Sequence, residues 1–427
     1  MKIKDIHQIE NYKIIKEKEN CRDIRLYEFH DINLTGYSSY YPDVLLKTKK
    51  SNYLVLPIKE ICMSLNKKSY YEENGMDYDY HNDVYGNYNK NIIDEEVYFF
   101  IYNTENYYHF IYDTLPCLYV YLEIRKDNPK IKLLMNYNKN QDKLLAFVKE
   151  SLELLEIKKE NIIIHQENNI YKKVYLSNSL THDGMSNHPP RKEIFDIYNI
   201  MIRNALYQAD SYQKVNYDKI YISRRTWKNN NLTDNIGTNY TTRRKMMNED
   251  SLVEMLNEKG FIEIFGENYS MIEKIILFNN ANYVIGAIGG TITNCIFCKS
   301  NSKIITLVSP EFLKINYRMK YLFGKNVLLF DDTYLDCNEG EIAPNIRIEI
   351  TDSKLEEYRC IGEIIRKCNN GYEIKLGKNY IGFNENDKYE KIYLKEEQFK
   401  KLDNGINSPW NVNMKEFIKI KIDNNNR

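Results

Sequence analysis

The stretch VYFFIYNTENYYHFIYDTLPCLYVYLEIRKDNPKIKLLM, residues 97–135, decides the fold class. It opens with five consecutive apolar or aromatic residues, 97–101, a pattern typical of a strand buried on both faces of a sheet. A helix is predicted over 106–126, and a second apolar run follows at 131–135. Strand, helix and strand in this order predict two parallel strands joined by a crossover helix.

The alternation of strands and helices continues along the chain in two series. Further strands are expected at 161–164, 173–176, 219–223, 261–265, 283–286 and 303–308, with helices at 141–155, 191–210, 248–260 and 270–279. Two such series predict an α/β chain with two Rossmann-like lobes. We expect an irregular N-terminal region over 1–90 that packs on the first lobe, lobes over 91–210 and 211–335, and a β-rich extension over 336–427.

The composition excludes several classes of protein. The 427 residues carry 60 basic and 60 acidic side chains, and this zero net charge argues against a nucleic-acid binder. No apolar run approaches the roughly 18 residues of a membrane span, and the first 20 residues lack the apolar core of a secretory signal, so we expect a cytoplasmic protein. Eight cysteines include one CxxC pair, Cys295 and Cys298, without a second pair at metal-site spacing.

A first candidate site lies in residues 106–116, NYYHFIYDTLP. Helical spacing places Asn106, His109 and Asp113 on one face of the predicted helix. This helix follows the carboxyl end of a buried strand, where open α/β sheets bind their ligands. An imidazole and a carboxylate four residues apart can form a proton-accepting pair. A polar network that caps the helix start is the alternative interpretation.

Two further segments suit an anionic ligand. Ser223, Arg224 and Arg225 follow the first strand of the second series, and guanidinium groups match phosphate oxygens. Another basic run lies at 243–245. Residues 286–294, GAIGGTITN, indicate a strand, a glycine-rich turn and a helix whose first amides can bind an anion. Surface charge and close packing are the respective alternatives.

Taken in order, these residues resemble glycosyltransferase family 61. The family pattern Asn-Tyr-(Tyr/Phe)-His-x-x-x-Asp-x-Leu-Pro is matched by 106–116, and its Ser-Arg-Arg by 223–225. Its helix that begins with Asn-Glu is matched at 248–249, its Leu-Ser-(Phe)-x-Glu-Gln-Ile helix at 270–275, and its Gly-Ala-His-Gly-Ala-Gly-Leu-Thr-Asn loop at 286–294. The resemblance covers about residues 95–310.

The resemblance implies an inverting nucleotide-sugar transferase of GT-B architecture, with a cleft between its two lobes. A hexosyl or pentosyl group would move from a nucleotide-diphosphate donor, such as UDP-GlcNAc or UDP-xylose, to a hydroxyl of a glycan, glycoprotein or lipid-linked acceptor. The family likeness further implies that no metal and no cofactor takes part.

The resemblance also assigns roles to individual side chains. Asp113 would be the base, His109 would orient the acceptor or relay its proton, and Asn106 would lie on the acceptor side. The donor would contact residues of the second lobe, namely Ser223, Arg224, Arg225, Asn248, Glu249, Glu267, Glu273, Gly286, Gly289, Gly290, Thr291 and Asn294.

One departure from the family pattern leaves alternatives open. Ile288 stands where the family loop has histidine. Arg225 or Thr291 would then replace the imidazole at the phosphates, or the chain would be an inactive nucleotide- or sugar-binding structural protein. Another GT-B-like transferase of polysaccharide synthesis, such as one that moves pyruvyl groups, is a further alternative. Residues 77–79, DYD, match a metal-binding DxD but lie in a polar segment typical of a loop.

Overall fold

A computed structural model of the chain gives its architecture. It describes residues 12–16, 24–35, 45–47, 52–54, 91–100, 104, 106–137, 143–166, 169–177, 180–181, 191–209, 215–225, 246–309, 327–335, 342–350, 361–368, 371–376, 390–401 and 410–420. Two segments noted in the sequence, the DYD at 77–79 and the basic run at 243–245, lie outside these residues.

The first sheet contains the buried strand that begins the stretch of residues 97–135. β5 (Asn91–Phe99), β6 (Lys132–Met135), β7 (Ile162–Ile164) and β8 (Asn169–Ser177) run parallel in the order β8-β5-β6-β7. The consecutive residues Val97 to Phe100 are all fully buried, because this strand is covered on both faces. The strand, helix and strand predicted over 97–135 are confirmed.

Four N-terminal strands widen this sheet, although the sequence led us to expect an irregular region. β2 (Ile24–Thr35) pairs antiparallel with β8, and it also pairs with β1 (Tyr12–Lys16) and β3 (Leu45–Lys47). β4 (Asn52–Leu54) pairs with β3 at the edge. Apolar and polar residues are mixed along β2, as in a strand covered on one side, and this signal is weaker than a continuous apolar run.

The helix predicted over 106–126 is a composite of four helical segments. α4 (Tyr107–His109) leads into a π-helix at Phe110–Thr114, a 3-10 turn at Leu115–Cys117 and then α5 (Leu118–Asp127). Pro116 explains the irregularity, because it has no N–H to donate and its ring crowds the preceding turn. α6 (Ala146–Leu154) and α7 (Ile194–Tyr207) are regular helices.

The second sheet is entirely parallel. Its strands are β9 (Lys219–Ile222), β10 (Ile262–Ile264), β11 (Tyr283–Ala287), β12 (Lys303–Leu307) and β13 (Val327–Phe330), in the order β10-β9-β11-β12-β13. In chain order this is 2-1-3-4-5, so the topology switches direction between β9 and β11. Doubly wound sheets bind their ligands beyond the carboxyl ends of the strands at this switch point.

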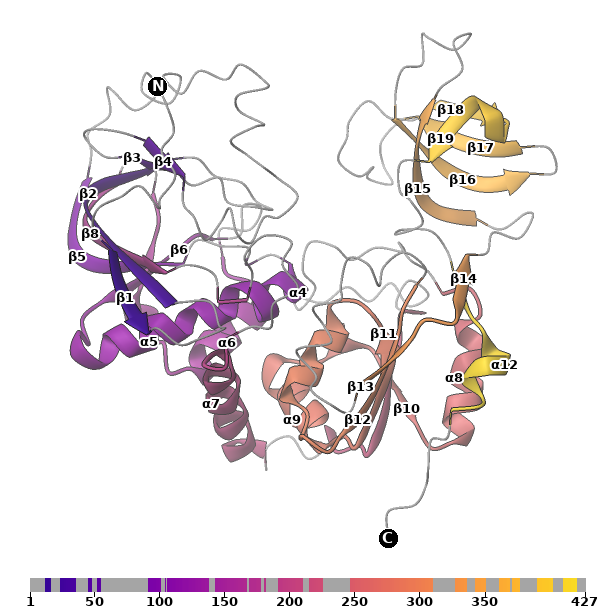
Figure 1. The fold of residues 1–427 in the computed structure, drawn as a ribbon, viewed down its shortest axis with the longest axis horizontal. Helices are drawn as coiled ribbons and strands as arrows, with labels where there is room; N and C mark the ends of the chain where they lie inside the picture. The colour runs from indigo at the N-terminus through magenta and orange to yellow at the C-terminus, as the bar shows by residue number, and fades with distance from the viewer. Residues whose placement is uncertain are drawn as a thin grey trace.

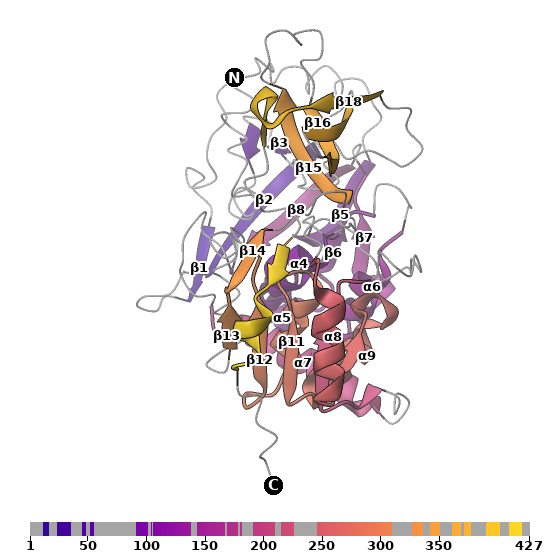
Figure 2. The ribbon, with the colours of Figure 1, turned by 90° about the vertical axis from the view of Figure 1, so that its right-hand side faces the viewer.

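Alternating residues of the second sheet face two different cores. Ile220 and Ile222 belong to a large core that also contains the interior of the first sheet, whereas Tyr221 between them belongs to a smaller core. α7 and α9 (Met271–Asn280) contact each other on the side of the large core. α8 (Glu249–Glu258) covers the opposite face (Figures 1 and 2). The two sheets therefore share one continuous hydrophobic core.

The C-terminal part of the chain forms a separate sheet and then a segment that packs on the second sheet. Residues 342–401 include a five-stranded antiparallel sheet, which stands apart at the upper right of Figure 1. Its strands are β15 (Ile342–Ile350), β16 (Ile361–Cys368), β17 (Gly371–Leu376), β18 (Glu390–Leu394) and β19 (Phe399–Lys401).

The last described residues return to the second sheet. β20 (Trp410–Val412) pairs with β14 (Thr333–Leu335), and α12 (Met414–Phe417) follows it. Trp410, Val412 and Phe417 are buried in the small core beside α8. The chain is thus an α/β protein with two mostly parallel sheets, as predicted, and its C-terminal residues complete the outer face of the second one.

Trp410→Ala tests this return of the C-terminal segment. Trp410 is 1% exposed, so its truncation should lower the free energy of unfolding by about 3–5 kcal/mol, measured by urea denaturation. Tyr207→Ala is the control, because Tyr207 is 91% exposed and its loss should change stability by less than about 0.5 kcal/mol. Equal stabilities of the two variants would contradict the assignment of Trp410 to the core.

Candidate functional site

The first candidate segment places its three predicted side chains together. Asn106 is the N-cap of α4, and its Oδ1 accepts a hydrogen bond from the His109 N–H at 3.2 Å. The π-helix that follows is fully buried and contains Asp113. Widened helical turns of this kind are frequent at functional sites. The capping network and the imidazole–carboxylate pair, which the sequence offered as alternatives, are therefore both present.

His109 and Asp113 form a close pair of unequal exposure. His109 Nδ1 lies 2.6 Å from Asp113 Oδ2. The Asp113 side chain is fully buried, whereas the His109 side chain is 19% exposed. The Tyr108 ring packs edge-on against the imidazole at 5.1 Å between centroids. A carboxylate at Nδ1 favours the tautomer with its proton on Nδ1, which leaves Nε2 as a proton acceptor.

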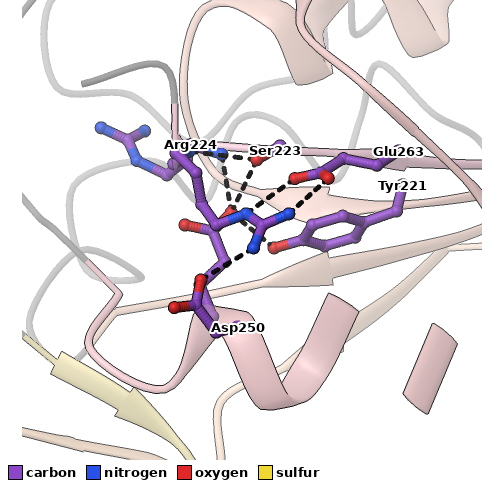
Figure 3. A network of polar contacts seen from close by, with 7 residues as sticks. Tyr221, Ser223, Arg224, Asp250 and Glu263 are labelled. Carbon is purple, nitrogen blue, oxygen red and sulfur yellow. Dashed lines mark hydrogen bonds and ion pairs between the residues drawn. The ribbon is translucent and has the colours of Figure 1, made fainter. Parts of the chain in front are cut away.

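Glu249 organises the turn after β9. Its Oε1 accepts hydrogen bonds from the Tyr221 hydroxyl at 2.8 Å, the Ser223 hydroxyl at 3.3 Å and the Arg224 N–H at 2.7 Å (Figure 3). The Glu249 side chain is buried, and burial raises the pKa of its carboxyl while the bond from the Arg224 amide lowers it. One carboxylate of α8 therefore fixes the carboxyl end of β9.

Arg225 is held by two acidic residues. Its Nε donates to Glu263 Oε1 at 2.8 Å, a second nitrogen donates to Glu263 Oε2, and a third donates to Asp250 Oδ1 at 2.8 Å. The hydrogen bonds to Glu263 are the main reason why the pKa of Arg225 is raised. Figure 3 shows Asp250 and Glu263 approaching from α8 and β10. This guanidinium fastens the turn to the neighbouring elements.

Arg224 lies against the glycine-rich loop that follows β11. Its guanidinium donates to the Ile288 carbonyl at 3.4 Å. A Cβ at Gly289 would lie 2.8 Å from a guanidinium nitrogen of Arg224, so glycine leaves room for this side chain. Burial lowers the pKa of Arg224 below its usual value. The two segments that the sequence marked for phosphate therefore meet at the switch point of the second sheet.

Tyr107 joins the first segment to this loop. Its hydroxyl donates to Asn294 Oδ1 at 2.5 Å, and Asn294 Nδ2 donates to the Thr291 carbonyl at 2.8 Å. A Cβ at Gly290 would be in ordinary van der Waals contact with Tyr107, 3.8 Å from its nearest atoms. The His109–Asp113 pair thus belongs to the same helical segment as a residue that touches the loop of the second sheet.

The region of the chain that matches a known protein family contains these same segments. Residues 107–305 match the family glycosyltransferase 61. This match confirms the resemblance to glycosyltransferase family 61 that the sequence motifs indicated. No curated protein matches the chain in sequence. The family match supports glycosyl transfer as the class of reaction, with a sugar donor and an acceptor as its partners.

Two residues that the family 61 resemblance assigned to the donor make contacts within the fold. Asn248 exchanges two hydrogen bonds with the backbone of Val412, at 2.7 and 3.0 Å, and so holds β20 at the start of α8. Glu273 forms a capping box with Ser270, in which the Ser270 N–H donates to Glu273 Oε2 at 2.7 Å. Glu273 thus stabilises the start of α9, whereas Asn248 makes no capping hydrogen bond in α8 and binds β20 instead.

The remaining predicted donor residues lie around the glycine-rich loop after β11. Gly266 and Thr291 are in close contact, since a Cβ at Gly266 would lie 2.2 Å from the Thr291 side chain. Glu267 follows in a 3-10 turn after β10. Gly286 lies in β11 against Ile222 of β9. Residues 291–297 form a 3-10 helix at the position where the sequence predicted a helix.

Sequence reasoning missed Lys274 and the bridging role of Tyr107. Lys274 is 3% exposed, and its Nζ lies over the Tyr107 ring, 4.7 Å from the centroid. Burial lowers the pKa of Lys274 to about 8, which the charges of Glu150, Glu267 and Glu273 oppose. A usable signal was present: Lys274 stands three residues after the buried Met271, on the apolar stripe of α9.

The remaining features of the structure concern metal ligands, helix length and cysteines. Within its described residues there is no cluster of three or more His, Cys, Asp or Glu side chains suited to a metal ion. No helix among them is both long and apolar enough to cross a bilayer. Cys295 and Cys298 are free thiols, and burial raises the pKa of Cys295.

Lys274→Met is expected to raise the free energy of unfolding at pH 7, by up to about 3 kcal/mol. The reason is that the pKa of Lys274 is about 8 in the folded chain, below its ordinary value of 10.5. Below pH 8 the lysine is charged in both states, so the full cost of burying its charge is present. Between pH 8 and 10.5 the folded lysine is neutral, and the cost declines as the pH rises.

Urea denaturation of both proteins between pH 7 and pH 10 measures this effect. The stability difference between variant and wild type should be constant below pH 8 and should shrink above it. A difference that does not change across this range would contradict the buried position of the charge.

Proposed function

We propose that this protein is an inverting glycosyltransferase of GT-B architecture. It transfers a hexosyl or pentosyl group from a nucleotide-diphosphate donor, such as UDP-GlcNAc or UDP-xylose, to a hydroxyl of a glycan, glycoprotein or lipid-linked acceptor. The observation that supports it most directly is the hydrogen bond from Tyr107 to Asn294. That contact brings the segment of the His109–Asp113 pair to the loop at the switch point of the second sheet.

The donor diphosphate is proposed to bind at the carboxyl ends of β9 and β11. Open α/β sheets bind ligands there, and the amides of Gly289 and Gly290 begin the helical turn that follows. Arg224 lies beside the same glycines and supplies positive charge for the departing diphosphate. Positive charge and helix amides at this place support transfer without a metal ion or other cofactor.

Arg225 has a different part in this proposal from the one that the resemblance implied. Its guanidinium already forms hydrogen bonds with Glu263 and Asp250, which leaves Arg224 as the arginine beside the loop. Arg225 therefore supports the turn, and Arg224 contacts the donor. Ile288 is buried in the large core, so its side chain does not replace the imidazole of the family loop.

His109 is proposed as the group that accepts the proton of the acceptor hydroxyl. The family resemblance assigned this role to Asp113, but the Asp113 carboxylate is fully buried and its Oδ2 contacts His109 Nδ1. The imidazole is the more exposed member, and its Nε2 can take the proton while Asp113 stabilises the imidazolium that forms. The hydroxyl oxygen then attacks the anomeric carbon, and the bond to the nucleotide diphosphate breaks.

A panel of nucleotide sugars, with mass-spectrometric detection of hydrolysis and transfer, tests this function. His109→Ala should lower the rate by about 10²–10⁴-fold and leave the Kd for the nucleotide diphosphate unchanged. His30→Ala is a matched control, because His30 also pairs with a carboxylate, Glu28 at 3.0 Å, but its own side chain is exposed.

Three outcomes separate the alternatives. Full activity of the His109 variant would contradict the assignment of the base. Nucleotide binding by the wild type without turnover of any donor would favour an inactive binding protein, for which the Ile288 substitution is the supporting observation. Transfer of a pyruvyl group instead of a sugar would favour the other transferase.

A further inference from the structure

Lys274 occupies a position where a charge is costly. It lies on α9 between buried residues, on the stripe that faces the core shared by the two sheets. A buried ammonium normally has an oppositely charged or hydrogen-bonded partner, because its transfer from water is otherwise strongly unfavourable. An aliphatic residue at this place would satisfy the fold without that cost.

No carboxylate among the described residues forms an ion pair or hydrogen bond with the Lys274 ammonium, which lies over the face of the Tyr107 ring. Three carboxylates act on it from farther away. Two of them are engaged elsewhere at the start of α9, since Glu150 accepts the Met271 N–H and Glu273 accepts the Ser270 N–H. Among the described residues, this buried cation therefore has no hydrogen-bond acceptor for its ammonium.

The same tyrosine connects this cation to the loop of the second sheet. Tyr107 donates a hydrogen bond to Asn294 through its hydroxyl, while its ring face lies under the Lys274 ammonium. A Cβ added at Gly290 would lie 3.8 Å from the start of the Tyr107 side chain. The aromatic face attracts a cation and keeps it in place before a ligand arrives. Arg224, in the turn after β9, lies beside this loop, and Lys274, in α9, is connected to it through Tyr107.

We propose that Lys274 is a donor-binding residue whose ammonium contacts the diphosphate of the nucleotide-sugar substrate. This inference rests on the proposed function, because it assumes that the loop binds a nucleotide diphosphate. The diphosphate supplies the acceptor oxygens that the ammonium lacks, and the lysine in turn offsets the charge that develops as the sugar–diphosphate bond breaks. Arg224 and Lys274 together provide two positive charges at the leaving group.

Isothermal titration of the full chain with UDP, GDP, ADP, CDP and dTDP at pH 7 tests the assignment. The wild type should bind at least one of these nucleotides, and Lys274→Met should weaken that binding by about 10–100-fold. Binding of the corresponding nucleoside monophosphate should weaken less. Lys274→Arg, which keeps the charge, should recover part of the affinity.

Lys303→Met is the matched control. Lys303 also lies over a tyrosine ring, 5.2 Å from the centroid of Tyr283, but at the amino ends of β11 and β12. Its loss should leave nucleotide binding unchanged. Thermal unfolding and a second variant, Lys274→Gln, show whether a loss of binding occurs in a folded protein.

The possible results separate this inference from the proposed function. If the wild type binds one of the diphosphates and both folded Lys274 variants, Lys274→Met and Lys274→Gln, bind it equally well, the role of Lys274 is overturned and the proposed function stands. If the wild type binds none of the five, the proposed function fails and the inference fails with it. Equal weakening by Lys274→Met and Lys303→Met would also overturn the assignment, because it would indicate a non-specific charge effect.

Discussion

The contact between Tyr107 and Asn294 is the interaction on which the candidate site depends. The hydroxyl of Tyr107 donates to Asn294 at 2.5 Å, and burial raises the pKa of this hydroxyl well above its usual range, so it remains a donor. Tyr107 begins the helical segment that contains His109 and Asp113, while Asn294 follows the glycine-rich loop. One hydrogen bond thus links the segment of the His109–Asp113 pair to the glycine-rich loop of the second sheet, where we propose that the donor binds.

The positive charges around the candidate site come from two arginines with different partners and from one buried lysine. Zero net charge first excluded only a nucleic-acid binder, and it now agrees with a small anionic substrate that is bound by a few cations. Glu249 fixes the turn after β9 through the Arg224 amide, and Arg225 is bound to Glu263 and Asp250. The rigid turn then presents Arg224 to the loop.

Much of the fold followed from the sequence because continuous apolar runs and glycine-rich turns are strong local signals. The strand at 97–101 and the loop after β11 were found in this way. β2 was missed, since its mixed pattern of apolar and polar residues is weaker than an unbroken run. The partners of Arg225 and the position of Lys274 depend on pairing between β9 and β10 and between distant helices, which local patterns do not encode.

A double-mutant cycle of Tyr107→Phe and Asn294→Leu, read out as kcat/KM for sugar transfer, tests the central claim most directly. If the contact unites the site, each single variant lowers kcat/KM and the double variant is no worse than the poorer single one, with a coupling of about 0.5–3 kcal/mol. Strictly additive effects of the two substitutions would contradict the account, because they would show that the two segments act independently.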